Sequence, residues 1–229
     1  METLVSKKSF SNSQSLGLDT TFNGTILIPD ISGFTKFVNE TEFAAGREII
    51  RQLLQVIINN NVLNLKISEI EGDAILFYTK HPLTPIQIKD QYEIMLGRFR
   101  EKVNELSLIN GFEIDLSLKL IAHYGELSTY LIGGFEKLYG KAIIEAHALL
   151  KNSIKSKSYF LLTDNILDGN EKKFAGTYFY AGSQLCETYG DLKKIGYLYL
   201  DYGDIVDNSI NRPIDGLLFK EEKRVLQKL

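Results

Sequence analysis

The sequence predicts an α+β domain in which helices flank a mixed, mostly antiparallel sheet. The predicted elements follow the order strand–helix–strand–strand–helix–strand–strand–helix–strand, and further strands come after them. Strand–helix–strand units at both ends of this series are typical of a ferredoxin-like core. A chain of 229 residues, 44% of them hydrophobic and 24% charged, is long enough to bury one sizeable core.

Apolar runs and period-two alternation predict the strands. Pro29 complicates the first run, Ile26–Asp30, because it lacks an amide donor and proline usually marks a sheet edge or a strand end. The next two strands form a hairpin around Glu71-Gly72. The two hairpin strands are Leu63–Glu69 and Asp73–Thr79. Later strands are predicted at Ile114–Tyr124, with Glu126–Ile132 as a separate partner strand, and at Tyr159–Thr163. Further strands are predicted between Thr177 and Tyr202 around a Gly190-Asp191 turn, and a short strand pairing is predicted around Ser15–Phe22.

Helical periodicity predicts the helices. Apolar residues form a one-sided stripe along Ala45–Asn59, and a longer stripe runs along Ile86–Leu108 until Asn110-Gly111 ends it. Further helices are predicted from Thr35 onward and at Ala142–Ile154.

The chain is expected to form an N-terminal extension (residues 1–24), one domain (25–202) and a polar C-terminal tail (203–229). A net charge of −3 gives no basic face for nucleic acid. No apolar run approaches the ~20 residues that span a membrane, and no secretory signal is visible. The lone Cys186 fits a reducing compartment. We therefore expect a cytoplasmic protein with neither nucleic-acid nor membrane partners.

Two aspartates could form a metal site. Asp30 ends the first strand, and Asp73 follows the hairpin turn. If these strands are neighbours, both carboxylates lie at one edge of the sheet beside the loop Ser32–Thr35, whose following helix has an N-terminus that favours phosphate. Such an arrangement can hold Mg²⁺ or Mn²⁺ with a nucleoside triphosphate. In the alternative, Asp30 is a helix cap and Asp73 a turn residue.

Four ordered segments resemble the motifs of class III nucleotidyl cyclases, the adenylyl and guanylyl cyclase catalytic domains. They are Pro29–Thr35, Glu69–Ala74, Lys119–Glu126 and Tyr139–Ile144, and Tyr189–Asp201 is similar to the last strand of the family. The resemblance spans about residues 25–202, and an uncharacterised bacterial branch of cyclase-like proteins is the most similar.

The resemblance implies roles for particular residues. It implies two divalent ions, Mg²⁺ or Mn²⁺, on Asp30, Asp73 and the carbonyl of Ile31. Lys119 stands at a phosphate-contacting arginine, which keeps the charge without the bidentate geometry. The nucleotide-binding residues that it implies are Gly33, Phe34 and Thr35 in the turn, and Glu69 and Lys137 at the two base-selecting positions, where Lys137 fits neither the adenine nor the guanine pattern.

Two positions depart from the family. Ile144 replaces an asparagine that orients the ribose, and Ala148 replaces an arginine on the phosphates. A preorganised group of this kind is worth about 10²- to 10³-fold in rate, so the resemblance implies a slow or degenerate cyclase. Lys141 or Lys151 could substitute for the arginine; alternatively, this helix face has become packing surface.

Three hypotheses follow. The first is a head-to-tail homodimer with composite sites, which converts a nucleoside triphosphate into a 3′,5′-cyclic nucleotide and pyrophosphate. The second is an inactive module that binds nucleotide and metal, or another protein. The third is a cyclase that uses an unusual base.

The remaining polar residues receive structural interpretations. We expect His123 to be buried and hydrogen-bonded rather than a general base, and Glu71 to be a solvated turn residue rather than an extra acid near the metals. His81, His147 and Cys186 lack the spacing of a zinc site.

Overall fold

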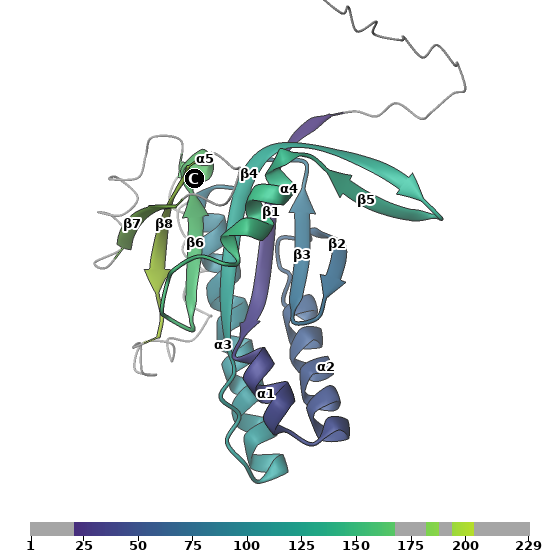
Figure 1. Cartoon of the computed structure of the whole chain (residues 1–229), viewed down its shortest axis with the longest axis vertical. Coiled ribbons are helices and arrows are strands. Elements are labelled where there is room, and N and C mark those ends of the chain that lie inside the picture. Colours follow the sequence, from purple (N-terminus) through teal and green to yellow (C-terminus); the bar gives the residue numbers. More distant parts are fainter. Residues whose placement is uncertain (1–20, 168–181, 188–193, 204–229) are drawn as a thin grey trace, which may run out of the picture.

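The computed structural model describes residues 21–167, 182–187 and 194–203 (Figure 1). Most of the predicted N-terminal extension, the Gly190-Asp191 turn and the tail after Gly203 lie outside these residues. The elements are β1 (Phe22–Ser32), α1 (Phe34–Glu40), α2 (Phe43–Asn59), β2 (Lys66–Glu71), β3 (Ala74–Thr79), α3 (Pro85–Asn110), β4 (Ser117–Ile132), β5 (Phe135–Tyr139), α4 (Lys141–Leu149), β6 (Tyr159–Thr163), α5 (Asp164–Leu167), β7 (Gly182–Glu187) and β8 (Ile195–Asp201).

The described strands form one mixed sheet in the order β2-β3-β1-β4-β6-β8-β7, and β5 pairs with β4 beside it. Among the described pairs, β4 and β6 run parallel and the others run antiparallel. Helices cover both faces of the sheet (Figure 1). The predicted fold class is therefore confirmed.

Pro29 lies in a central strand and not at the sheet edge or strand end that a proline usually marks. β1 runs from Phe22 to Ser32 between β3 and β4. Its pairing with β3 lapses between Leu27 and Asp30, which face Phe77 and Ala74. The ladder with β4 continues through Pro29, opposite Leu120. The N–H that Pro29 lacks is therefore missing at the point where the β1–β3 ladder is interrupted.

The predicted partner strand Glu126–Ile132 is wrong. It continues the preceding strand, so that β4 is one strand from Ser117 to Ile132. Its hairpin partner is β5, which begins after Gly133 and Gly134, both with positive φ. Sequence reasoning placed the turn but missed the short strand behind it. Figure 1 shows this β4–β5 hairpin extending away from the sheet as an arm.

The two long helices were well predicted. α2 begins where the Glu42 side chain accepts hydrogen bonds from the amides of Ala44 and Ala45. α3 begins with a capping box between Thr84 and Gln87, and it ends at Gly111 in the left-handed region. α4 ends at Leu149, five residues before the predicted Ile154. No helix among the described residues is long and apolar enough to cross a membrane.

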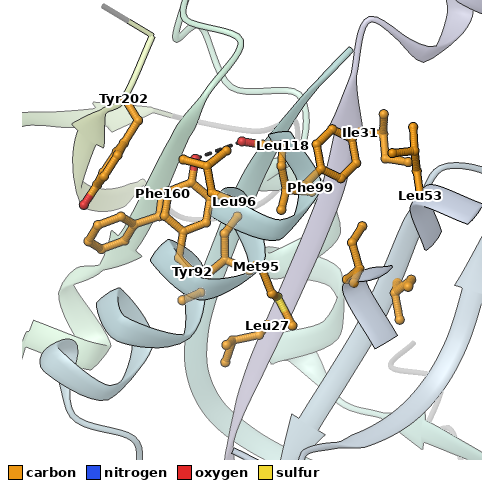
Figure 2. Close-up of a cluster of buried hydrophobic side chains, with 14 of the residues drawn as sticks. Leu27, Ile31, Leu53, Tyr92, Met95, Leu96, Phe99, Leu118, Phe160 and Tyr202 are labelled. Carbon is orange, nitrogen blue, oxygen red and sulfur yellow. Dashed lines mark hydrogen bonds between the residues drawn. The ribbon is translucent and has the colours of Figure 1, made fainter. Parts of the chain in front are cut away.

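Two apolar clusters of described residues hold the layers together. The larger lies between the sheet and α1, α2 and α3, and the smaller lies between the sheet and α4. Figure 2 shows the larger cluster, in which Tyr92 packs near Phe160 and Tyr202. The Tyr92 hydroxyl donates a hydrogen bond of 2.8 Å to the carbonyl of Leu118, so this buried polar group is satisfied.

Candidate functional site

The two predicted acids lie side by side, Asp30 on β1 and Asp73 in the turn directly before the neighbouring strand β3. Asp30 of β1 pairs with Ala74 of β3 in register, and Asp73 directly precedes Ala74. The amide of Ile31 donates a hydrogen bond of 3.1 Å to the carbonyl of Asp73, which fixes the turn against β1. The central sheet therefore sets the relative position of the two carboxylates.

Burial and mutual repulsion mark these acids as an unusual pair. Burial, followed by the negative charge of Asp30, raises the pKa of Asp73 to about 6, and a hydrogen bond between the two side chains contributes in the same direction. On the other side of Asp30, Lys119 of β4 places Nζ 3.3 Å from Oδ2. The ammonium offsets part of the repulsion, and a divalent cation would offset more of it.

A cavity of about 140 Å³ opens beside the two acids. Its lining contains four carboxylates, one imidazole and apolar side chains, contributed by Ile28, Asp30, Glu69, Glu71, Asp73, Ala74, Leu76, His147 and Leu150. Ligand pockets usually measure roughly 300–1,000 Å³. This space can therefore take a metal and part of a triphosphate, and the rest of a nucleotide would extend beyond it.

The donor set fits a hard divalent cation. Asp30 and Asp73 offer oxygen ligands, and no group of three or more His, Cys, Asp or Glu residues in the described part of the chain is arranged to hold a metal. Mg²⁺ is commonly bound by one or two carboxylates, with water and substrate phosphates completing its coordination. Two acids in a small open cavity leave coordination positions for water and phosphate, which a site closed by protein ligands would not.

The two predicted base-selecting residues bind each other. Lys137 of β5 forms an ion pair with Glu69 Oε2 of β2, and His147 Nε2 of α4 lies 3.9 Å from the other oxygen, Oε1. The charge of Lys137, which fits neither base pattern, thus has a partner within the chain. Beside it, Glu136 accepts a hydrogen bond from Tyr78 and pairs with Lys66 at 3.7 Å, so several polar contacts attach β5 to the β2–β3 hairpin.

The structure does not bring the predicted turn residues Gly33, Phe34 and Thr35 into the cavity lining. Gly33 has a φ of 91°, and a Cβ there would lie 2.7 Å from the carbonyl of Asp115, so this turn requires glycine. Phe34 packs against the core, and Thr35 is exposed. With seven residues, α1 is also too short for a strong N-terminal dipole.

The two substituted positions on α4 differ in burial, since Ile144 is exposed and Ala148 is partly buried. Ile144 is 58% exposed, so more than half of it is not covered by the described part of this chain. Lys141 pairs with Glu145 at 2.7 Å, and neither Lys141 nor Lys151 lines the cavity. The described structure therefore gives neither lysine the position of the missing cation.

His123 is buried and hydrogen-bonded, as predicted. Its Nδ1 lies 3.0 Å from Thr163 Oγ1, and its Nε2 lies 3.1 Å from Glu145 Oε2. Burial lowers the pKa of His123, although the nearby Glu145 acts in the opposite direction. Because Glu145 lies on α4, this contact connects the helix to the sheet.

His147 is the residue that sequence reasoning missed. It was considered only as a zinc ligand, yet it lines the same cavity as the two aspartates. Its position three residues after Ile144 placed it on a related helix face, and that spacing was the available signal. Glu71 is exposed, as expected, but it is the last residue of β2 and not a turn residue, and it contributes to the cavity lining.

Sequence comparison finds relatives of unknown function. A family of proteins of unknown function, DUF2652, matches residues 50–159. An uncharacterized protein of Mycobacterium tuberculosis (strain ATCC 25618 / H37Rv), Rv2561/Rv2562, is 28% identical over 134 residues, which are 54% of this chain. The match covers 63% of that protein, so the chain spans less than two thirds of its relative.

Structural comparison finds nucleotidyl cyclases. The guanylyl cyclase Cya2 is similar with a TM-score of 0.60 at 15% identity, over 79% of this chain and 92% of that one. The adenylyl cyclase CyaB from P. aeruginosa matches with a TM-score of 0.53 at 12% identity, over 82% and 98%. The guanylate cyclase domain of RhGC from Catenaria anguillulae, in complex with GTP, matches with a TM-score of 0.54 at 15% identity, over 79% and 97%. The described chain thus has the fold of class III nucleotidyl cyclase catalytic domains.

Proposed function

We propose that this protein binds a nucleoside triphosphate through divalent metal at Asp30 and Asp73 and converts it slowly into a 3′,5′-cyclic nucleotide. The observation that carries the proposal is the contact between two partly buried carboxyl groups beside a small acidic cavity. Their repulsion gives the apo site a strong preference for a cation. The fold of nucleotidyl cyclases supports the choice of a nucleotide as the ligand.

In the proposed reaction, the ribose 3′-oxygen attacks the α-phosphorus, pyrophosphate leaves with the electrons of the broken P–O bond, and the 3′-hydroxyl proton passes to solvent. Two Mg²⁺ or Mn²⁺ ions held by Asp30, Asp73 and the Ile31 carbonyl would polarise the phosphate and activate the hydroxyl. Lys119, next to Asp30, would contact the phosphates. We assign the turn Gly33, Phe34 and Thr35 to positioning the chain around the site, since it lies outside the cavity.

We infer that Glu69 and Lys137 contact the base. Together they offer carboxylate acceptors and ammonium donors, which can pair with the edge of a purine. Because they form an ion pair with each other, a bound base would have to share or replace that contact. This arrangement favours weak base selection.

A second copy of the chain is the proposed partner. The β4–β5 arm exposes four large apolar side chains at 62–75%: Leu131, Ile132, Phe135 and Tyr139. A hydrophobic surface of this kind usually marks an interface, and the cavity is too small for a whole nucleotide. A head-to-tail homodimer would cover the arm and complete a composite site. Phe135→Lys should then give a monomer by sedimentation; an unchanged dimer would contradict the use of the arm.

A non-catalytic nucleotide-binding module is the second candidate. Ile144 and Ala148 favour it, because neither can donate a hydrogen bond to ribose or phosphate. In this case the protein binds nucleotide and metal with the same acids, and it acts through conformation or a partner instead of product.

One assay separates these candidates. The purified protein is incubated with each of the four nucleoside triphosphates and Mn²⁺, and cyclic product is sought by mass spectrometry. Product that disappears in Asp30→Asn supports the cyclase. Metal-dependent binding without product, lost in Asp73→Ala, supports the module. Absence of both binding and product would overturn the proposed function.

A further inference from the structure

We propose that His147 is a substrate-binding residue, which donates a hydrogen bond to the phosphates of a nucleotide held at Asp30 and Asp73. The inference rests on the proposed function and adds a group to its site. It assigns to α4 a polar contact with the substrate that neither Ile144 nor Ala148 can make.

The composition of the cavity lining carries this proposal. Among the described residues that line it, four are acids, four are aliphatic, and His147 alone has a side-chain N–H. Phosphate oxygens accept hydrogen bonds, and carboxylates cannot supply them at neutral pH. Metal ions reduce the repulsion between phosphate and carboxylate, but the phosphate oxygens that do not bind metal still lack a hydrogen-bond donor. An imidazole carries at least one N–H whether it is neutral or protonated, so His147 can pair one of these oxygens.

His147 is positioned to make this contact. α4 is anchored on the sheet by the buried residues Ala142, Ala146 and Leu149, which pack in the smaller cluster. Figure 1 shows α4 lying over the face formed by β1 and β4. The helix backbone is therefore fixed, and the side chain of His147, 34% exposed, reaches the cavity from it.

The present partner of His147 does not compete strongly. Its Nε2 lies 3.9 Å from Glu69 Oε1, which is longer than a hydrogen bond. Glu69 already pairs with Lys137 through its other oxygen. Within the described part of the chain, turning His147 toward a phosphate therefore breaks no hydrogen bond at Nε2 and leaves Glu69 paired.

Direct ligation of a metal by His147 is the main rival. Mg²⁺ and Mn²⁺ favour carboxylate, carbonyl and water ligands, whereas imidazole suits zinc, copper and nickel better. The two-aspartate site also leaves coordination positions that phosphate oxygens and water can fill. The proposal therefore assigns His147 to the phosphates, and the two interpretations predict different effects on binding of Mn²⁺ alone.

The test measures binding by the full chain with two kinds of probe. Mn²⁺ alone is titrated by electron paramagnetic resonance. Each nucleoside triphosphate, and inorganic tripolyphosphate, is titrated in the presence of Mn²⁺ by calorimetry. The variants are His147→Ala and His147→Gln, which keeps an N–H donor, and the matched control is His81→Ala at an exposed histidine outside the cavity lining. Circular dichroism confirms that each variant is folded.

We expect His147→Ala to weaken binding of nucleotide and tripolyphosphate by about 10-fold, as for a lost hydrogen bond to a charged group. His147→Gln should lose less, and His81→Ala should lose nothing. Binding of Mn²⁺ alone should not change in any variant. Recovery in His147→Gln distinguishes a donor from a merely structural side chain.

Three results would overturn the inference. If His147→Ala binds nucleotide as well as the wild type, His147 does not contact phosphate, and the proposed function stands without it. If His147→Ala loses Mn²⁺ alone to the same extent, His147 is a metal ligand. If the wild type binds no nucleotide with Mn²⁺, the inference and the proposed function fail together.

Discussion

The carboxylate corner (Asp30 and Asp73) lines the cavity and the α4 face (Ile144 and Ala148) does not, and the chain holds the two differently. Asp30 lies on a central strand, is 9% exposed, and is held between Asp73 and Lys119. Ile144 lies on a surface helix and is 58% exposed. The acids are part of the sheet's own architecture, whereas the α4 residue contacts little within the described chain.

This difference in burial indicates that the fold itself maintains the two acids but not the α4 side chains. Exposed positions accept substitutions at a cost usually within about 0.5 kcal/mol, so folding places little constraint on Ile144. A charged pair in a sheet needs compensation by a cation, because unpaired charges are costly to bury. The corner thus requires a cation, whether Lys119 or a metal, and α4 supplies catalytic groups only where its sequence happens to contain them.

The largest expected effect comes from breaking the corner. Asp30→Asn should weaken Mn²⁺-dependent binding of nucleoside triphosphate by at least about 100-fold, because the loss of a ligating charge removes several kcal/mol of attraction. Isothermal calorimetry measures this effect. Asp115→Asn is the control, since Asp115 is an exposed acid paired with Lys157 outside the cavity lining. Equal losses in both variants would show that general acidity, and not the corner, attracts the ligand.

A smaller effect is expected from rebuilding the α4 face. The double variant Ile144→Asn with Ala148→Arg should raise the rate of cyclic nucleotide formation by about 10- to 100-fold, given the usual value of groups aimed at developing charge. Product formation with Mn²⁺ is followed by mass spectrometry. Ala148→Lys is the comparison, since it adds the charge without the bidentate geometry. If the rate does not rise, the weakness of the site does not lie in α4.

Much of the corner could be predicted from sequence because its determinants are local. An apolar run that ends in Asp30 and a turn that precedes Asp73 indicate strands and acids directly. The spacing between strands is regular, so two such acids on neighbours must lie close. In the structure Asp30 lies opposite Ala74, and the carbonyl of Asp73 accepts a hydrogen bond from the amide of Ile31, so the two acids are neighbours. Metal binding itself stays a prediction.

The errors arose where tertiary contacts override local patterns. Pro29 fits into a central strand because the β1–β3 pairing is interrupted there while the β1–β4 pairing continues, and the sequence does not show this. β5 is five residues long and mostly exposed, so its apolar pattern was too short to separate from a turn. The link between Lys137 and Glu69, like the position of His147, depends on how the β4–β5 arm and α4 lie against β2. These contacts join residues far apart in the chain.

The attachment of α4 to the sheet can be tested at His123. His123→Gln should lower the free energy of unfolding by about 1–2 kcal/mol, since it disturbs buried hydrogen bonds to Thr163 and Glu145. Burial lowers the pKa of His123 below its usual value of 6.5, so protonation opposes folding and the wild type loses stability as the pH falls below 6.5. Urea denaturation at pH 7.5 and pH 5.5 should show less pH dependence in the variant. Equal pH dependence would contradict the assignment, and His81→Gln serves as the exposed control.

The smallest effect concerns the repulsion between the two acids. The pKa of Asp73 rises from 3.8 to about 6 in the folded chain, so above pH 6 its ionisation opposes folding, and this cost is relieved as the pH falls from 6 toward 4. Asp73→Asn should therefore be more stable than the wild type at pH 7.5 in EDTA, by less than about 1 kcal/mol because the side chain is half-exposed and screened. At pH 4 this advantage should disappear.

Urea denaturation measures the difference between the two proteins, in which the contribution of His123 cancels. With saturating Mn²⁺ at pH 7.5, the wild type should be more stable than Asp73→Asn, because a cation that binds the two acids only in the folded chain stabilises the folded state. An advantage for Asp73→Asn that stays the same in EDTA and in Mn²⁺ would show that the corner is a strained pair of acids without a metal. In that case Lys119 alone compensates the charge of Asp30. The carboxylate corner would then be like the α4 face: its residues are part of the fold, but they take no part in catalysis.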